Sequence, residues 1–325
     1  MRAAFFSPFV VLAFLVPGLP GQTVGPVPAA AQQAGTPTAT PPAAEMAAIT
    51  MGAEGGDPLA QTRLGFAYTF GKGVEQSYAV AVLWFGRAAS AGFAPAQRNL
   101  GAFYEQGWGV SRDLGTAIRW YRAAAEQGDA SAQCRLGNLF HEGRGVPRND
   151  AEAAAWFLKA AEQGDGVAQN NLGSLYHHGQ GLPQDFAQAL FWYRKAAEQG
   201  LPGAESNLGV MYQNGSGVSQ DYRQAAAWYR AAAQHGASRG ALNLAEMYSN
   251  GRGVPLDYVS AFVWYSRAAA SGDTLARGAL KDVSGVMTLN QKREALARLA
   301  GAQDPAPQDE QARFDVDHVA GANEK

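Results

Sequence analysis

Residues 96–131 read AQRNLGAFYEQGWGVSRDLGTAIRWYRAAAEQGDAS, and this 36-residue pattern occurs six times, beginning at Ala60, Ala96, Ala132, Ala168, Ala204 and Gly240. Tryptophan keeps the same spacing at Trp84, Trp120, Trp156, Trp192, Trp228 and Trp264. Self-similarity at a fixed period of this length is typical of stacked supersecondary units rather than of one globular core. The chain is therefore predicted to be an all-α solenoid of helix-turn-helix repeats, in which each unit contacts mainly its neighbours.

Each repeat predicts two helices that flank a glycine-rich turn. In the second repeat, Ala96, Leu100 and Tyr104 fall on one helical face. Gly107 then ends the first helix, because glycine readily adopts the positive φ of a helix end. Asp113 is a residue type that caps the next helix by accepting hydrogen bonds from free N–H groups. The cap position reads Ser77, Asp113, Asn149, Asp185, Asp221 and Asp257.

The tryptophan of each repeat lies in the second predicted helix, among small residues. Ala117 and Ala124 share a face with Trp120 and allow a close approach of backbones. We therefore expect the tryptophan to fill the space between layers. Replacing any one of these tryptophans with alanine is expected to cost about 3–5 kcal/mol, as for other buried aromatic residues.

Different sequences flank the array at its two ends. Residues 44–56 keep the repeat register without a tryptophan and predict an N-terminal half-repeat before the repeats at 57–272. Residues 273–300 predict C-terminal capping helices, with a capping box at Thr288 and Gln291. A polar terminal helix is expected to cover the apolar face of the last repeat. Residues 301–325 hold six acidic residues against Arg313 and Lys325, which predicts a disordered acidic tail or a peptide motif around Phe314.

The N-terminus has the features of an export signal. Met1 and Arg2 precede an apolar run from Ala3 to Val16, which is shorter than the roughly 20 residues of a membrane-spanning helix. Ala29–Ala31 offers a cleavage site, and the region around Gly21 is a weaker one. Residues 1–31 are therefore predicted to be a signal peptide, followed by a Pro/Ala/Thr-rich linker at 32–43 and a periplasmic or secreted mature chain. An uncleaved membrane anchor is the alternative.

The pattern Ala-x-x-x-Leu-Gly-x-x-Tyr, then Gly-x-Gly-Val, Asp, Ala, Trp and Ala-Ala, resembles the Sel-one-like repeat family, a 36-residue relative of the tetratricopeptide repeat. The departures are small; for example, Ser77 stands for Asp, Phe140 for Tyr and Ala245 for Gly. The resemblance implies an α/α superhelix in which the first helix of each pair lines the concave side. It also implies an adaptor that assembles or regulates other proteins.

Composition and motifs favour neither catalysis nor nucleic-acid binding. The formal charge of −2 and pI of about 6.2 lack the basic excess of a nucleic-acid binder. The single cysteine, Cys134, excludes an internal disulfide and reads as an incidental thiol. His141 and His177 belong to successive repeats and are expected to lie too far apart to share a metal. The sequence thus predicts no enzyme, no metal site and no cofactor.

One polar row is the candidate binding site. Three, six and ten residues after the leading residue of each repeat, the side chains share a face of the first helix that differs from the core face. On the architecture that the resemblance implies, this face lines the concave groove. Amides suit an extended peptide because they both donate and accept hydrogen bonds, and Arg63 and Arg135 suit a carboxylate. The candidate residues are Arg63, Asn99, Arg135, Asn171, Asn207, Asn243, His178, Asn214 and Asn250.

Other interpretations of this row and of the function accompany this hypothesis. The asparagines can instead stabilise the stack by forming hydrogen bonds with neighbouring backbone.

The leading hypothesis for the function is a non-enzymatic scaffold of the bacterial envelope that binds a protein or peptide in the groove. The alternative is binding of peptidoglycan or another polysaccharide, with Trp108 in an exposed turn stacking on sugar rings. A hydrolase acting on envelope material is the least favoured reading, since no matching motif is present.

Overall fold

The computed structural model describes residues 43–301, which form helices and turns without any strand. The predicted signal peptide and most of the linker, together with nearly all of the acidic tail, lie outside the described residues. The chain divides after Gln220 into two compact units. In unit 1 the helices are α2 (Ala43–Glu54), α3 (Pro58–Phe70), α4 (Tyr78–Ser90), α5 (Ala94–Gln106), α6 (Leu114–Glu126), α7 (Ala130–Glu142), α8 (Asp150–Glu162), α9 (Gly166–His178), α10 (Phe186–Ala197) and α11 (Pro202–Asn214). In unit 2 they are α12 (Tyr222–Gln234), α13 (Ser238–Asn250), α14 (Tyr258–Ala270), α15 (Thr274–Val286) and α16 (Leu289–Ala300).

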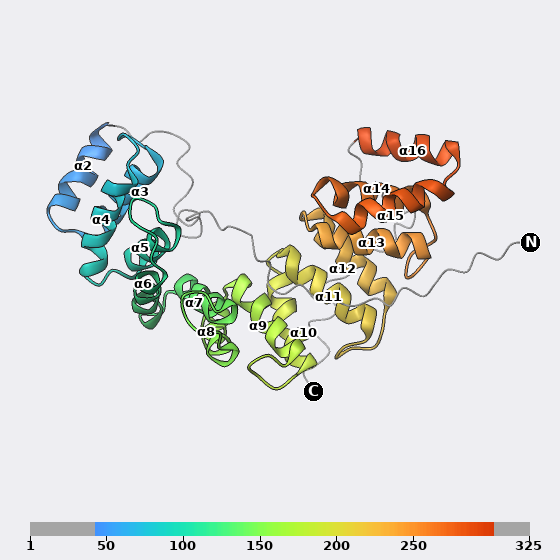
Figure 1. Ribbon diagram of the computed structural model, residues 1–325, viewed down its shortest axis with the longest axis horizontal. Coiled ribbons are helices and arrows are strands. Elements are labelled where there is room, and N and C mark those ends of the chain that lie inside the picture. Colours follow the sequence, from blue (N-terminus) through green and yellow to red (C-terminus); the bar gives the residue numbers. More distant parts are fainter. Residues whose placement is uncertain (1–42, 302–325) are drawn as a thin grey trace, which may run out of the picture. The chain divides into compact units, whose positions relative to one another are not determined.

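Within each unit the helices stack in sequence order (Figure 1). The first helix of a repeat packs on the second helix of its own repeat and on that of the preceding repeat, as α5 does on α6 and α4. The predicted α/α solenoid is therefore confirmed. No helix within residues 43–301 is both long and apolar enough to cross a membrane.

The helix ends follow from local side-chain chemistry. Asp113 accepts a hydrogen bond from the Thr116 backbone N–H at 3.0 Å, and every residue of the predicted cap position caps its helix in the same way. Gly107 ends α5 with a φ of 77°. A Cβ on Gly109 would overlap the backbone of Tyr78, the first residue of α4. The second glycine of the turn is thus needed for the close approach of consecutive repeats.

The residue after the tryptophan, rather than the tryptophan itself, fills the space between helices. Phe157 is 1% exposed, whereas Trp156 is half-buried beneath the Lys159 ammonium, 4.3 Å from the ring centroid. A Cβ on Gly137 of α7 would lie 2.6 Å from the Phe157 ring, so this glycine makes room for the ring. The same pairing joins Gly65 with Phe85, Gly101 with Tyr121, and Gly173 with Tyr193. The prediction for tryptophan is therefore wrong in four repeats; only Trp192 and Trp264 are buried.

A row of buried glutamines, which the sequence analysis missed, also ties the repeats of unit 1 together. Gln97 Nε2 donates to the carbonyl of Ala89 in the preceding repeat at 3.2 Å, and Gln97 Oε1 accepts from Gln127 Nε2 at 2.7 Å. Equivalent bonds are made by the pairs Gln133 with Gln163 and Gln169 with Gln199. Gln61 donates to the Ala53 carbonyl in the same way, but its Oε1 has no partner, because Ala91 stands where the others have glutamine. The ladder satisfies buried amides that would otherwise destabilise the stack.

The two ends of the helical array are closed differently. α2 packs on α3 and buries Met46 and Ala53 against Ala60 and Leu64. At the other end, Thr288 and Gln291 form the predicted capping box and α16 packs on α14. However, α16 buries only Ala295 and leaves Leu289 and Leu296 exposed. α16 therefore covers part of α14, while α15 and α16 also carry apolar residues on their open sides.

Candidate functional site

The polar row on the first helices contains both internal and open residues. At the position three residues after the leading residue, Asn99 and Asn207 are buried, while Arg135, Asn171 and Asn243 are half-buried. Arg63 alone is exposed at this position. At the position ten residues after the leading residue, every side chain is exposed: Phe70, Gln106, Glu142, His178, Asn214 and Asn250.

The asparagines of the row bond to other protein groups. Asn171 Nδ2 donates to Asn138 Oδ1 in the preceding repeat at 2.9 Å, and Asn207 Nδ2 donates to Asn170 Oδ1 at 3.0 Å. Asn99 Nδ2 donates to the Pro95 carbonyl at 2.7 Å, one turn earlier in α5. Asn171 and Asn207 therefore contact other side chains, and Asn99 bonds within its own helix, whereas the stack-stabilising interpretation predicts bonds to neighbouring backbone. Asn99 and Asn207 therefore contribute nothing to an open surface.

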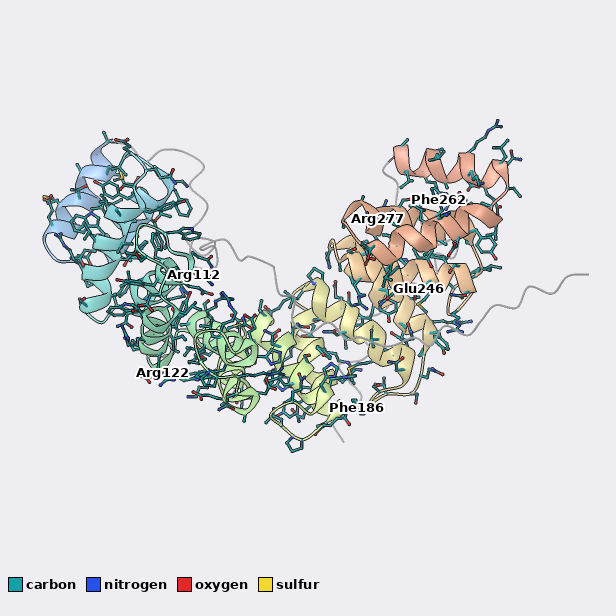
Figure 2. The ribbon with its side chains drawn as sticks, in the orientation of Figure 1. Arg112, Arg122, Phe186, Glu246, Phe262 and Arg277 are labelled. Carbon is teal, nitrogen blue, oxygen red and sulfur yellow. The ribbon has the colours of Figure 1, made fainter. Side chains whose placement is uncertain are left out.

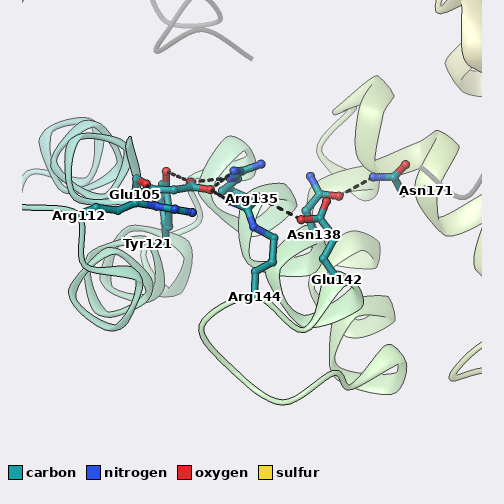
Figure 3. Close-up of polar contacts among 8 residues, drawn as sticks. All are labelled: Glu105, Arg112, Tyr121, Arg135, Asn138, Glu142, Arg144 and Asn171. Carbon is teal, nitrogen blue, oxygen red and sulfur yellow. Dashed lines mark hydrogen bonds and ion pairs between the residues drawn. The ribbon is translucent and has the colours of Figure 1, made fainter. Parts of the chain in front are cut away.

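Arg135 binds a carboxylate, but that carboxylate belongs to the same chain. Its Nε donates to Glu105 at 2.8 Å, and a second guanidinium nitrogen also bonds this carboxylate (Figure 3). Arg144 lies 3.2 Å from Glu105, and the Tyr121 hydroxyl donates to it at 2.9 Å. Burial and the Glu105 charge raise the pKa of the Tyr121 hydroxyl, which therefore stays protonated and able to donate.

Glu105 was not singled out from the sequence. It occupies a position that reads Thr69, His141, His177, Gln213 and Ser249 in the other repeats. Its carboxylate is almost completely buried and joins the second repeat to the third. The signal that could have found it is an isolated acidic residue among neutral ones on a helix that faces the next repeat.

The first repeat presents the open part of the row. Leu59, Arg63, Phe66 and Phe70 fall on one face of α3, and we call these four residues the α3 stripe. Leu59 and Phe70 are 48% and 47% exposed, and Phe66 stacks on Phe70 with ring centroids 6.4 Å apart. Arg63 makes no hydrogen bond or ion pair with any other described residue, so its guanidinium remains available to a partner.

The histidine pair at His177 and His178 is packed against an aromatic ring. His177 is buried between His178 and Phe186, whose ring centroids lie 4.9 and 5.1 Å away, and neither of its ring nitrogens has a partner (Phe186 is labelled in Figure 2). Burial and the neighbouring His178 lower the pKa of His177 to about 4. In the preceding repeat, His141 Nδ1 instead lies 2.8 Å from Asp150, the equivalent of Phe186. In the described part of the chain, no three His, Cys, Asp or Glu side chains are arranged to hold a metal ion.

Trp108 and Cys134 are both part of the packing. Trp108 is half-buried, with Tyr78 stacked on it at 5.8 Å and Phe103 in a T-shaped contact at 5.6 Å between ring centroids. The exposed turn tryptophan expected for sugar stacking is thus partly enclosed. Cys134 is buried, and burial together with the Asp165 carboxylate raises the pKa of its thiol, which disfavours the reactive thiolate.

The repeat pattern of one known family matches most of the chain. The Sel1 repeat matches at residues 58–93, 94–129, 130–165, 166–201, 202–236 and 238–273. The chain belongs to the Sel1 repeat family. Sel1 repeat proteins are generally scaffolds for protein–protein interactions and are typically non-catalytic.

Two solved structures of Sel1-like repeat proteins are similar to this chain. One is c5321, described as a protective antigen of uropathogenic Escherichia coli with an SLR fold; it is 37% identical over 79% of this chain, with a TM-score of 0.71. The other is a Sel1 repeat protein from Oxalobacter formigenes, 36% identical over 65% of this chain and 84% of its own length, with a TM-score of 0.61. This chain spans 56% of the E. coli protein. No curated protein matched the chain.

Proposed function

We propose that this Sel1 repeat protein is a non-enzymatic scaffold of the bacterial envelope that binds a protein or peptide along its first helices. The observation that carries the proposal is the contrast within the polar row. Asn99, Arg135, Asn171 and Asn207 bond within the chain, whereas Arg63 has no partner within residues 43–301 and lies among exposed apolar side chains. The α3 stripe therefore offers a partner both an available guanidinium and exposed apolar side chains.

The α3 stripe supports recognition of an apolar side chain next to a carboxylate. Leu59 and Phe70 offer apolar surface that is lost from water on binding. Arg63 can bind a carboxylate in bidentate fashion. Lys72, whose ammonium lies 6.0 Å from the centre of the Phe70 ring, adds a second positive charge beside the stripe. The exposed residues at position ten, including His178, Asn214 and Asn250, offer further contacts along the array.

The envelope location rests on the sequence of residues 1–31. The basic start, short apolar run and small residues at Ala29–Ala31 support export of the mature chain into the periplasm or beyond the cell. An exported scaffold would meet envelope proteins or secreted partners.

An affinity pulldown tests the proposal. The mature chain, Gln32–Lys325, is exposed to envelope extract beside two variants. The first carries Leu59→Ser, Arg63→Glu and Phe70→Ser; the control carries Leu83→Ser, which changes a more exposed apolar residue on α4. Circular dichroism melts first establish that both variants are folded.

The expected result is a protein retained by the parent and by the α4 control but lost by the α3 variant. Retention by all three chains would exclude the α3 stripe as the site. The absence of any retained protein would contradict the scaffold function itself.

A further inference from the structure

The last two helices of unit 2 expose apolar stripes. On α15, Leu275 and Val286 are 70% and 57% exposed and lie on the same face, eleven residues apart. On α16, Leu289 and Leu296 are 65% and 58% exposed and lie seven residues apart, also on one face. We call these two stripes, taken together, the α15–α16 face; each of the two helices packs on α14. Large exposed apolar side chains concentrated on one pair of helices are typical of a surface that another segment covers.

The same helices carry positive charge without matching carboxylates. Residues 274–300 hold five basic residues (Arg277, Lys281, Lys292, Arg293 and Arg298) and two acidic ones (Asp282 and Glu294), a difference of +3. Arg298 is paired with Glu294 at 2.6 Å. Arg277, labelled in Figure 2, donates only to the Gly272 carbonyl, and Lys281, Lys292 and Arg293 have no ion-pair partner among the described residues.

The chain itself continues into a segment of complementary chemistry. Residues 302–325 hold six acidic residues and two basic ones, a difference of −4, and carry the apolar residues Phe314, Val316 and Val319. This segment begins immediately after α16. The thirteen residues from Gly301 to Phe314 can span roughly 40 Å when extended. That distance is about twice the length of a 13-residue helix such as α15, at 1.5 Å per residue.

We propose that the acidic segment 302–325 binds the α15–α16 face of its own chain. Phe314, Val316 and Val319 would cover the exposed leucines and valine, and the adjacent carboxylates would lie near Lys281 and Lys292. A second copy of the chain is the less suitable occupant. A twofold contact of this face with itself would bring two surfaces of charge +3 together. The proposal concerns unit 2, whereas the α3 stripe belongs to unit 1, and it does not depend on the proposed function.

Zero-length carbodiimide crosslinking of the mature chain tests this proposal, because the reagent joins only an amine and a carboxylate in direct contact. The expected products are crosslinks between Lys281 or Lys292 and carboxylates at residues 309–317, found in the monomer. Replacing Phe314, Val316 and Val319 with serine should lower their yield at least fivefold. Added salt at 0.5 M should also lower it, since charges are screened within about 4 Å at that concentration.

Two controls make the result decisive. Lys281→Arg keeps the positive charge and removes the reactive amine, so only the Lys281 crosslink should disappear. Lys159 on α8 reports random encounters of the tail with the array. Crosslinks to Lys159 as abundant as those to Lys281 and Lys292 would overturn the proposal. So would tail crosslinks found only between two copies, or yields that the serine substitutions leave unchanged.

Discussion

Replacing Phe157 with alanine should destabilise the array more than replacing its larger neighbour, Trp156. Phe157 is 1% exposed, and truncating a buried phenylalanine costs about 3–5 kcal/mol through lost transfer energy and the remaining cavity. Trp156 is half-buried. Complete burial of a large apolar side chain stabilises the fold by roughly 1.5–3 kcal/mol, and half-buried Trp156 should contribute about half of that. Its contact with Lys159 adds about 0.5–1 kcal/mol. Trp156→Ala should therefore cost about 1–2.5 kcal/mol.

Gly137 provides a second, independent measure of the same contact. The methyl group of Gly137→Ala would lie 2.6 Å from the Phe157 ring, and overpacking of this kind costs about 1–3 kcal/mol. The better helix propensity of alanine offsets about 1 kcal/mol of that cost. Once Phe157 is truncated, only the propensity gain remains. Gly137→Ala should therefore change from neutral or destabilising in the parent to stabilising in the Phe157→Ala background, a coupling of about 1–3 kcal/mol.

Urea unfolding followed by circular dichroism measures all four variants without depending on tryptophan fluorescence. The midpoint is compared only among variants with the same denaturant slope, because a repeat array can unfold in steps. A cost for Trp156→Ala equal to or above that of Phe157→Ala would refute the assignment of the buried anchor. An equal effect of Gly137→Ala in both backgrounds would refute the direct contact.

Three further changes test other parts of the stack. Ala91→Gln should supply the donor that Gln61 Oε1 lacks and raise the free energy of unfolding by about 1 kcal/mol, seen as a higher urea midpoint. Glu105→Gln should cost about 2 kcal/mol, below the 3–5 kcal/mol of a fully buried broken ion pair because its two arginine partners are partly exposed. Burial and the neighbouring His178 lower the pKa of His177 from 6.5 to about 4. Between pH 6.5 and pH 4 this histidine is protonated in the unfolded chain but not in the folded one, so the free energy of unfolding should fall as the pH is lowered through this range. Phe186→Asp should reduce that fall by pairing with the imidazolium; equal pH profiles in urea titrations would contradict this.

Local chemistry explains why the helix limits were predictable from the sequence. The cap at Asp113 and the glycine at Gly107 act within a few residues, so their effects can be read without knowledge of the stack. The choice between Trp156 and Phe157 was not readable in this way. The two side chains point about 100° apart on the helix, and only the groove left by Gly137 in another helix decides which one is buried.

The candidate site was predictable as a face but not as a set of contacts. The row three residues after the leading residue was identified from its spacing, and its suitability for carboxylates was visible in Arg135. The carboxylate that Arg135 binds belongs to Glu105, thirty residues earlier. The two residues meet because α7 stacks beside α5 and α6, and no local sequence pattern indicates this contact. Whether the α3 stripe binds a partner remains a prediction.

The glutamine ladder bears on how such a protein can change length. Each complete rung within residues 96–199 pairs two glutamines of one repeat and donates to a carbonyl of the repeat before it, as Gln133 and Gln163 do. A tandem duplication of one whole 36-residue unit in this region would therefore meet the same donors and acceptors at both junctions. An insertion of another length within a helix would shift this register and leave unmatched amides in the interior. Gain or loss of whole units within this region should therefore preserve the hydrogen bonds of the buried glutamines.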